Sequence, residues 1–196
     1  MARLWLIRHG RTAWNEDGRI QGRADPALCE TGRAEVQAWH LPQDGLCARW
    51  HASPLRRAQE TAALLTSAPV RLDDRLIEMD WGRFEGRRLA ELRAEAPEAM
   101  AANEGEGLDF RPPGGESPRD VMQRLRRFAA DIAHDRGPNV AVTHKGVMRA
   151  ALALAMGWDM RAGPPLRLGR DTALQLACHT DGRVELAHPP LHQLAG

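Results

Sequence analysis

Tyrosine is absent from this chain, and lysine occurs once, as Lys145, so arginine carries almost all of the positive charge. A large excess of either charge is also missing, because the chain has 27 basic and 26 acidic residues and a net charge of +1. Nucleic-acid binding depends on a strong positive field. The composition therefore argues against DNA or RNA as a partner.

Cysteines and long apolar runs are scarce as well. The N-terminal apolar run at 4–7 is interrupted by Arg8, too early for a signal sequence, and no other stretch approaches the length of a membrane span. We therefore expect a cytoplasmic protein without a membrane partner. Reduced thiols fit this location, because the three cysteines lack the paired spacing of a zinc site or a disulfide framework: Cys29, Cys47 and Cys178.

The length of 196 residues fits a single domain over 1–196. Short apolar runs predict strands at 3–8, 46–51, 70–72, 139–143, 172–179 and 183–187. Helical patterns with start signals such as Ser53-Pro54 predict helices at 32–40, 55–65, 87–96, 117–134 and 147–156, with a loop over 12–31. Pro97 ends the third of these helices, and the Gly- and Pro-rich stretch 98–116 is expected to be an irregular lid insertion.

Alternating strands and helices predict an α/β fold: a three-layer sandwich with a mostly parallel central sheet and helices on both faces. Ligands of such sheets bind beyond the carboxyl ends of the strands. The first predicted strand ends at Arg8 or His9, and a later one ends directly before His144. We therefore expect the two histidines to meet at one edge of the sheet.

The residue types at this edge suit phosphoryl transfer. A neutral imidazole such as that of His9 is a competent nucleophile near pH 7. Guanidinium groups match phosphate oxygens in a bidentate way, which makes Arg8 and one arginine of the Arg56-Arg57 pair candidate clamps. Gly10 allows the backbone to approach an anion closely. No run resembles the ligand spacing of a metal site, so neither a metal nor a cofactor is expected.

Six blocks in order along nearly the whole chain resemble the histidine phosphatase superfamily, a phosphoglycerate-mutase-like group. The blocks are L-I-R-H-G-R-T-A-W-N at 6–15, R-I-Q-G-R-A-D at 19–25, S-P-L-R-R-A-Q-E-T-A at 53–62, L-I-E-M-D-W-G-R-F-E-G at 76–86, G-G-E-S at 114–117 and V-T-H-K-G at 142–146.

This resemblance implies that His9 is the phosphorylated nucleophile and Arg8 its phosphate-binding neighbour. The clamp is the arginine immediately before the alanine, which selects Arg57 over Arg56. His144 is implied as the second pocket histidine, which donates to phosphate oxygens.

A proton donor for the leaving oxygen is implied at Glu78, which would later activate water. Glu85 and Asp80 lie close by in the sequence and stay open as alternatives. The resemblance also implies a phosphate contact for Asn15 and a substrate-facing position for Gln21 and Gly22.

The chain departs from the family pattern at three positions. Cys29 replaces a common threonine, Arg11 stands where Glu or Gln is frequent, and Lys145 occupies the place of a small residue. We interpret Lys145 as a candidate substrate contact. The charges of Arg11 and Lys145 favour a substrate that carries a second phosphate or a carboxylate.

The expected function is a metal-independent phosphomonoesterase that acts on a small phosphorylated metabolite. The start of the chain and its length resemble the α-ribazole phosphatases and the broad-specificity phosphatases of the same family. A phosphoglycerate-mutase-type phosphotransferase, which shares the same residues, is the alternative, and a non-catalytic binding module that retains the fold is a weaker one. The oligomeric state is not predicted.

Overall fold

The computed structural model describes residues 1–41, 47–135 and 137–195. Its six strands form one sheet in the order β3-β2-β4-β1-β5-β6. The predicted strand at 46–51 begins at Arg49, and its Leu46 lies outside the described residues. The strands are β1 (Ala2–Arg8), β2 (Arg49–Ala52), β3 (Val70–Leu72), β4 (Asn139–Thr143), β5 (Thr172–Cys178) and β6 (Val184–Gln193).

The predicted sandwich of helices on both faces of a mostly parallel sheet is confirmed. β4 pairs with β1 and β2 in parallel, β2 pairs with β3 in parallel, and β1–β5 and β5–β6 are antiparallel. The helices are α1 (Ala13–Glu16), α2 (Glu30–Gln37), α3 (Arg56–Leu65), α4 (Leu89–Glu95), α5 (Pro97–Gly105), α6 (Pro118–Ile132) and α7 (Lys145–Met156). None of them, within the described ranges, is long and apolar enough to cross a membrane.

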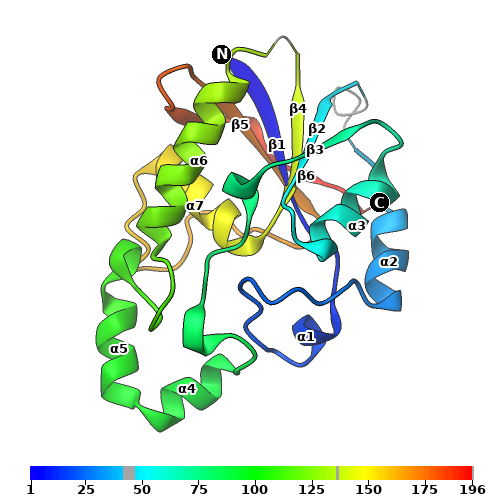
Figure 1. Cartoon of the computed structure of the whole chain (residues 1–196). Coiled ribbons are helices and arrows are strands. Elements are labelled where there is room, and N and C mark those ends of the chain that lie inside the picture. The colour runs from blue at the N-terminus through cyan, green and yellow to red at the C-terminus, as the bar shows by residue number, and fades with distance from the viewer. Residues whose placement is uncertain (42–46, 136, 196) are drawn as a thin grey trace.

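Alternating side chains of β1 divide the core into two layers. Leu4 and Leu6 pack with residues of α6 and α7, whereas Trp5 and Ile7 pack with residues of α2 and α3. This two-residue period is the one that a strand buried on both faces requires. Figure 1 shows α6 and α7 on one side of the sheet and α2 and α3 on the other.

The stretch 98–116 was predicted to be irregular, and this prediction is wrong for its first half. Pro97 is the first residue of α5, a position where its missing N–H and fixed φ cost nothing, rather than the end of the preceding helix. A 3-10 turn follows at Gly107–Asp109. Figure 1 shows α4 and α5 beyond the end of the sheet toward which β1 runs from the N-terminus.

Two further boundaries differ from the predictions. The loop expected over 12–31 contains the single turn α1, which Thr12 caps through its side chain, and α2 starts within it. Ser53 was taken as a helix cap, yet the residue that precedes α3 is Leu55. Ser53 is fully buried and bonds elsewhere, as described below.

Candidate active site

The β1–β4 pairing brings His9 to the predicted sheet edge. The His9 backbone N–H donates to the Thr143 carbonyl at 2.9 Å, directly before His144. The ring centroids of His9 and His144 lie 5.1 Å apart. The structure thus places the two histidines, distant in the sequence, side by side.

The His9 ring is held in one tautomer. Its Nδ1 lies 2.6 Å from the carbonyl oxygen of Gly10. A carbonyl can only accept a hydrogen bond, so Nδ1 carries the proton and Nε2 keeps its lone pair. Gly10 is itself fixed, because its N–H donates to Thr61 Oγ1 at 2.9 Å. The arrangement presents Nε2 as a nucleophile.

Both imidazoles are neutral near pH 7. Burial lowers the pKa of His9 well below 6.5, and the charges of Arg57 and Arg8 lower it further. Burial also lowers the pKa of His144 well below 6.5, followed by the charge of Arg57. A neutral His9 is reactive without first losing a proton.

His144 immediately precedes α7 and is fully buried. Its Nε2 lies 2.8 Å from the hydroxyl oxygen of Ser53. Its Nδ1 is buried and has no hydrogen-bond partner among the described residues. Buried polar atoms without a partner are rare in proteins, and a ligand is one explanation.

Arg57 is the arginine of its pair that enters the site. Its side chain is fully buried, with Nη1 and Nη2 donating at 2.7 Å to the carbonyls of Ala24 and Gly22. Its Nε, like that of Arg8 at the end of β1, is buried without a partner in the described structure. Arg56 instead faces solvent and forms an ion pair with Glu60 at 2.7 Å.

Glu85, an alternative proton donor, holds the loop that orients Arg57. Its carboxylate accepts from the backbone N–H groups of Arg23 and Ala24 at 2.7 and 2.9 Å. Gly22 has a φ of +54°, and a Cβ there would lie 2.0 Å from Glu85 Oε1. Gly22 therefore meets two demands at once: a left-handed backbone and a close approach. Asp80 accepts from the Gly82 N–H at 2.8 Å and caps that turn.

Glu78 lies close to the start of α7. Its carboxylate oxygens accept from Met79 N at 2.8 Å and from Gly146 N at 3.2 Å. A Cβ on Gly146 would lie 2.3 Å from Glu78 Oε1, so only glycine allows this approach. The two N–H groups fix the Glu78 side chain beside the first turn of α7.

The remaining predicted residues differ in their local partners. Asn15 Oδ1 accepts from Thr12 N at 3.1 Å, and buried Gln21 accepts from the Thr12 hydroxyl at 3.1 Å. Lys145 is the exposed first residue of α7. Arg11 forms an ion pair with Glu35 at 3.0 Å, which offsets the extra charge that the sequence suggested for the site.

Sequence reasoning missed Arg170 and misread Ser53. Arg170 Nη1 donates at 3.3 Å to the carbonyls of both His9 and Gly10. Burial and the charge of Arg8 lower the pKa of Arg170 to about 10. No periodic pattern surrounds Arg170, so the sequence offered no signal, whereas Ser53 stands in the quoted S-P-L-R-R block.

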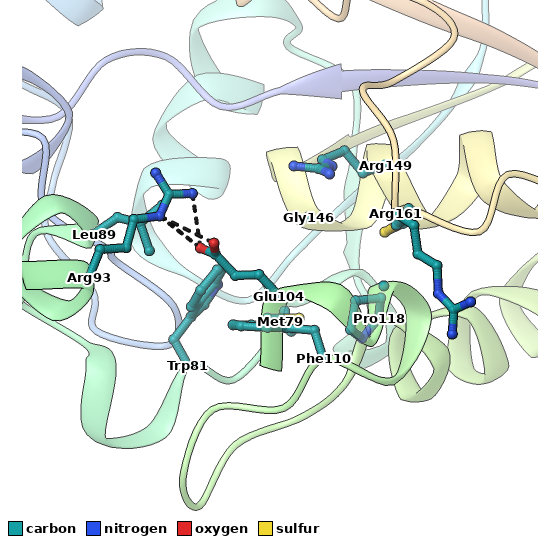
Figure 2. A pocket seen from close by; sticks show the side chains of 12 residues that line it. Met79, Trp81, Leu89, Arg93, Glu104, Phe110, Pro118, Gly146, Arg149 and Arg161 are labelled. Atoms are coloured by element: carbon teal, nitrogen blue, oxygen red, sulfur yellow. Dashed lines mark hydrogen bonds and ion pairs between the residues drawn. The ribbon is translucent and has the colours of Figure 1, made fainter. Parts of the chain in front are cut away.

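A cavity of about 310 Å³ adjoins Glu78 and is lined by both of its backbone donors, Met79 and Gly146. Figure 2 shows Arg93 and Glu104 joined on one side of this cavity and Arg149 extending from α7 on another. In the described ranges, no group of three or more His, Cys, Asp or Glu side chains is arranged to hold a metal ion.

Comparison with known proteins shows what this chain is similar to. Residues 4–189 match the family described as the histidine phosphatase superfamily (branch 1). The chain is 36% identical over 178 residues to the bifunctional protein Rv2228c of Mycobacterium tuberculosis, a match over 87% of this chain and 48% of that protein. The chain thus spans about half the length of that relative.

Two further matches extend over most of both chains. Glucosyl-3-phosphoglycerate phosphatase of Mycobacterium tuberculosis is 34% identical over 193 residues, which cover 90% of this chain and 86% of the relative. A solved structure of the mycobacterial glucosyl-3-phosphoglycerate phosphatase Rv2419c with VO3 superposes with a TM-score of 0.81 at 31% identity and covers 100% of both chains.

Proposed function

This chain belongs to the histidine phosphatase superfamily (branch 1), and on that basis we propose that it is a metal-independent phosphomonoesterase. Its substrate is a small phosphorylated metabolite, and its reaction passes through a phosphohistidine on His9. The observation that carries the proposal is the His9 ring: Nδ1 donates to Gly10 O, which leaves Nε2 unprotonated.

Three buried nitrogens can donate to an oxyanion in front of that ring. Arg8 Nε, Arg57 Nε and His144 Nδ1 have no partner among the described residues, and His9 Nε2 is free to attack. Fixed donors of this kind stabilise charge that develops in the transition state without reorganisation. Arg57 is the clamp in this proposal because two backbone carbonyls fix its guanidinium.

The reaction then proceeds in two displacements. His9 Nε2 attacks phosphorus, the bond from phosphorus to the ester oxygen breaks, and Glu78 gives its proton to that oxygen. Water next attacks the phosphoryl group, Glu78 takes a proton from the water, and the bond from phosphorus to His9 breaks. Inorganic phosphate leaves, and the second displacement restores both residues. Asn15, Gln21, Gly22 and Lys145 contact phosphate or substrate in this proposal.

Hydrolysis of p-nitrophenyl phosphate tests the function. We expect activity that survives EDTA, is inhibited by vanadate and vanishes in His9→Ala, together with an acid-labile, alkali-stable phosphoenzyme. Full activity of His9→Ala refutes the mechanism. Transfer of the phosphoryl group to a second metabolite in place of water would assign a mutase, and phosphate binding without turnover would assign a binding module.

Activity on a panel of phosphorylated metabolites narrows the range of candidate physiological substrates. Within the proposal we include α-ribazole 5′-phosphate, because the sequence resembles those phosphatases, and glucosyl-3-phosphoglycerate, which the name of a relative specifies. We also propose a cytoplasmic location, which the unpaired cysteines at 29, 47 and 178 support.

A further inference from the structure

The cavity beside Glu78 adjoins the residue to which we assigned protonation of the leaving oxygen. If Glu78 protonates the leaving oxygen, as the proposed function requires, the rest of that group must extend into space next to the Glu78 carboxylate. The Met79 and Gly146 N–H groups contact this carboxylate, and both residues line the cavity. The chemistry of the cavity wall therefore indicates the class of leaving group.

Most of this wall is apolar. One ion pair within it is already neutral, since Arg93 Nη2 and Glu104 Oε1 lie 2.9 Å apart. Figure 2 shows this pair on the opposite side of the cavity from Arg149. The apolar residues are Met79, Trp81, Leu89, Phe110 and Met160.

Arg149 is the half-buried cation of the wall, and neither Arg149 nor the exposed Arg161 forms an ion pair with a residue in the described ranges. The Arg149 Nε is buried without a partner, and no hydrogen bond or ion pair joins its guanidinium to a residue in the described ranges. Its guanidinium lies instead over the ring of Trp158, 5.1 Å from the centroid. A half-buried guanidinium beside apolar side chains favours an anionic ligand.

Other positive charges gather around Arg149. Lys145 precedes it by one turn at the start of α7, where the helix dipole disfavours cations. Partial burial lowers the pKa of Lys145 even though the residue reaches solvent, and the charges of Arg8, Arg149 and Arg170 lower this pKa further. An anion bound between α7 and the cavity wall would relieve this repulsion.

We propose that the leaving group carries a carboxylate of its own and that Arg149 binds it in this cavity. The inference rests on the proposed function and assigns its substrate class: phosphate monoesters of hydroxy acids with an apolar or aromatic body. The planar guanidinium matches a carboxylate in a bidentate way.

Two synthetic esters of nearly equal size test this proposal, 4-carboxyphenyl phosphate and 4-carbamoylphenyl phosphate. We expect the wild-type protein to hydrolyse the carboxylate ester with a kcat/KM roughly 10- to 100-fold higher, the range of a charged hydrogen bond. The amide-substituted phenolate is the better leaving group, so intrinsic reactivity works against this result. Hydroquinone bisphosphate is the third ester, and a preference for it over the carboxylate ester would overturn the assignment of a carboxylate.

Substitution of Arg149 locates the recognition. Arg149→Met keeps an unbranched apolar side chain at this position and should abolish the preference, mainly through a higher KM for the carboxylate ester. Arg149→Lys should keep part of the preference and serves if the methionine variant does not fold. The matched control is Arg126→Gln, because Arg126 lines a separate hollow with Asp181 and should leave the ratio unchanged.

The outcomes separate the two proposals. Equal kcat/KM for the carboxylate and amide esters in the wild-type protein overturns the assignment of the leaving group and leaves the phosphatase intact. A preference that survives in Arg149→Met overturns the role of Arg149. Hydrolysis of none of the three esters overturns both proposals.

Discussion

Acidification below pH 6.5 should destabilise this protein through its two buried histidines. Burial lowers the folded-state pKa of both His9 and His144 well below 6.5. The unfolded chain binds these protons with a pKa near 6.5, whereas the folded protein does not. The free energy of unfolding therefore holds its full value above pH 6.5 and falls as the pH drops below it, until the folded-state pKa is reached.

The size of this loss follows from proton linkage. For a histidine that stays neutral in the folded state, one pH unit below 6.5 costs about 1.4 kcal/mol relative to pH 7.5. His9 and His144 together should remove about 2.7 kcal/mol between pH 7.5 and 5.5. That is a large part of the free energy of unfolding of a whole domain, which is typically about 5–15 kcal/mol.

Urea unfolding followed by tryptophan fluorescence measures the loss, in buffers free of phosphate because a bound anion would stabilise the folded state. The comparison is between wild type and His144→Gln, whose amide can still bond to the Ser53 hydroxyl. The pH-dependent loss should shrink by about 1.4 kcal/mol in the variant. His51, whose pKa burial also lowers, contributes equally to both proteins. Identical losses in the two proteins would refute the assignment of a neutral, buried His144.

Two further predictions concern the residues around the histidines. Glu78→Gln keeps an acceptor for the Met79 N–H but has no proton to give to the leaving oxygen. We compare kcat/KM, which reports the displacement of the leaving group and not the later attack of water: it should fall by roughly 10²- to 10⁴-fold for an alkyl phosphate and by much less for p-nitrophenyl phosphate, because p-nitrophenolate leaves without a proton. Equal losses of kcat/KM on both esters would contradict the acid role. Gly22→Ala should lower the free energy of unfolding by about 1–2 kcal/mol because of its positive φ, and it should also displace Glu85. Displacement of Glu85 disturbs the loop that orients Arg57 and should weaken inhibition by vanadate. Gly18→Ala is the control: its φ is +67° and nothing lies within 4 Å of the added Cβ, so it should lower stability alone. Thermal unfolding measures the loss of stability, and vanadate titration measures the loss of affinity. An unchanged affinity for vanadate in Gly22→Ala would show that this loop does not orient Arg57 for binding.

The strands and their edge could be predicted from the sequence because their signals are local. A short stretch of sequence is enough to recognise a buried strand that is followed directly by a histidine and a glycine, as at Ile7 to Gly10. The alternation of Leu4 and Leu6 with Trp5 and Ile7 fits the two layers that the sheet separates. The α/β class followed from the order of these elements.

Features that depend on distant partners could not be read in this way. Arg11 looked like an extra charge for the site until the fold brought Glu35 within 3.0 Å of it. Ser53 looked like a helix cap, because its true partner, His144, lies far along the chain. Pro97 was ambiguous in principle, since proline both ends one helix and begins the next.

The pairing of β1 with β4 also has a consequence for synthesis in the cell. His9 leaves the ribosome well before Thr143, whose carbonyl accepts from the His9 backbone, and before the adjacent His144. Contacts of such large sequence separation form late, because the loop between them must first close. A nascent or truncated chain that ends before β4 therefore holds His9 without His144, and the pair of imidazoles forms only once β4 has joined the sheet.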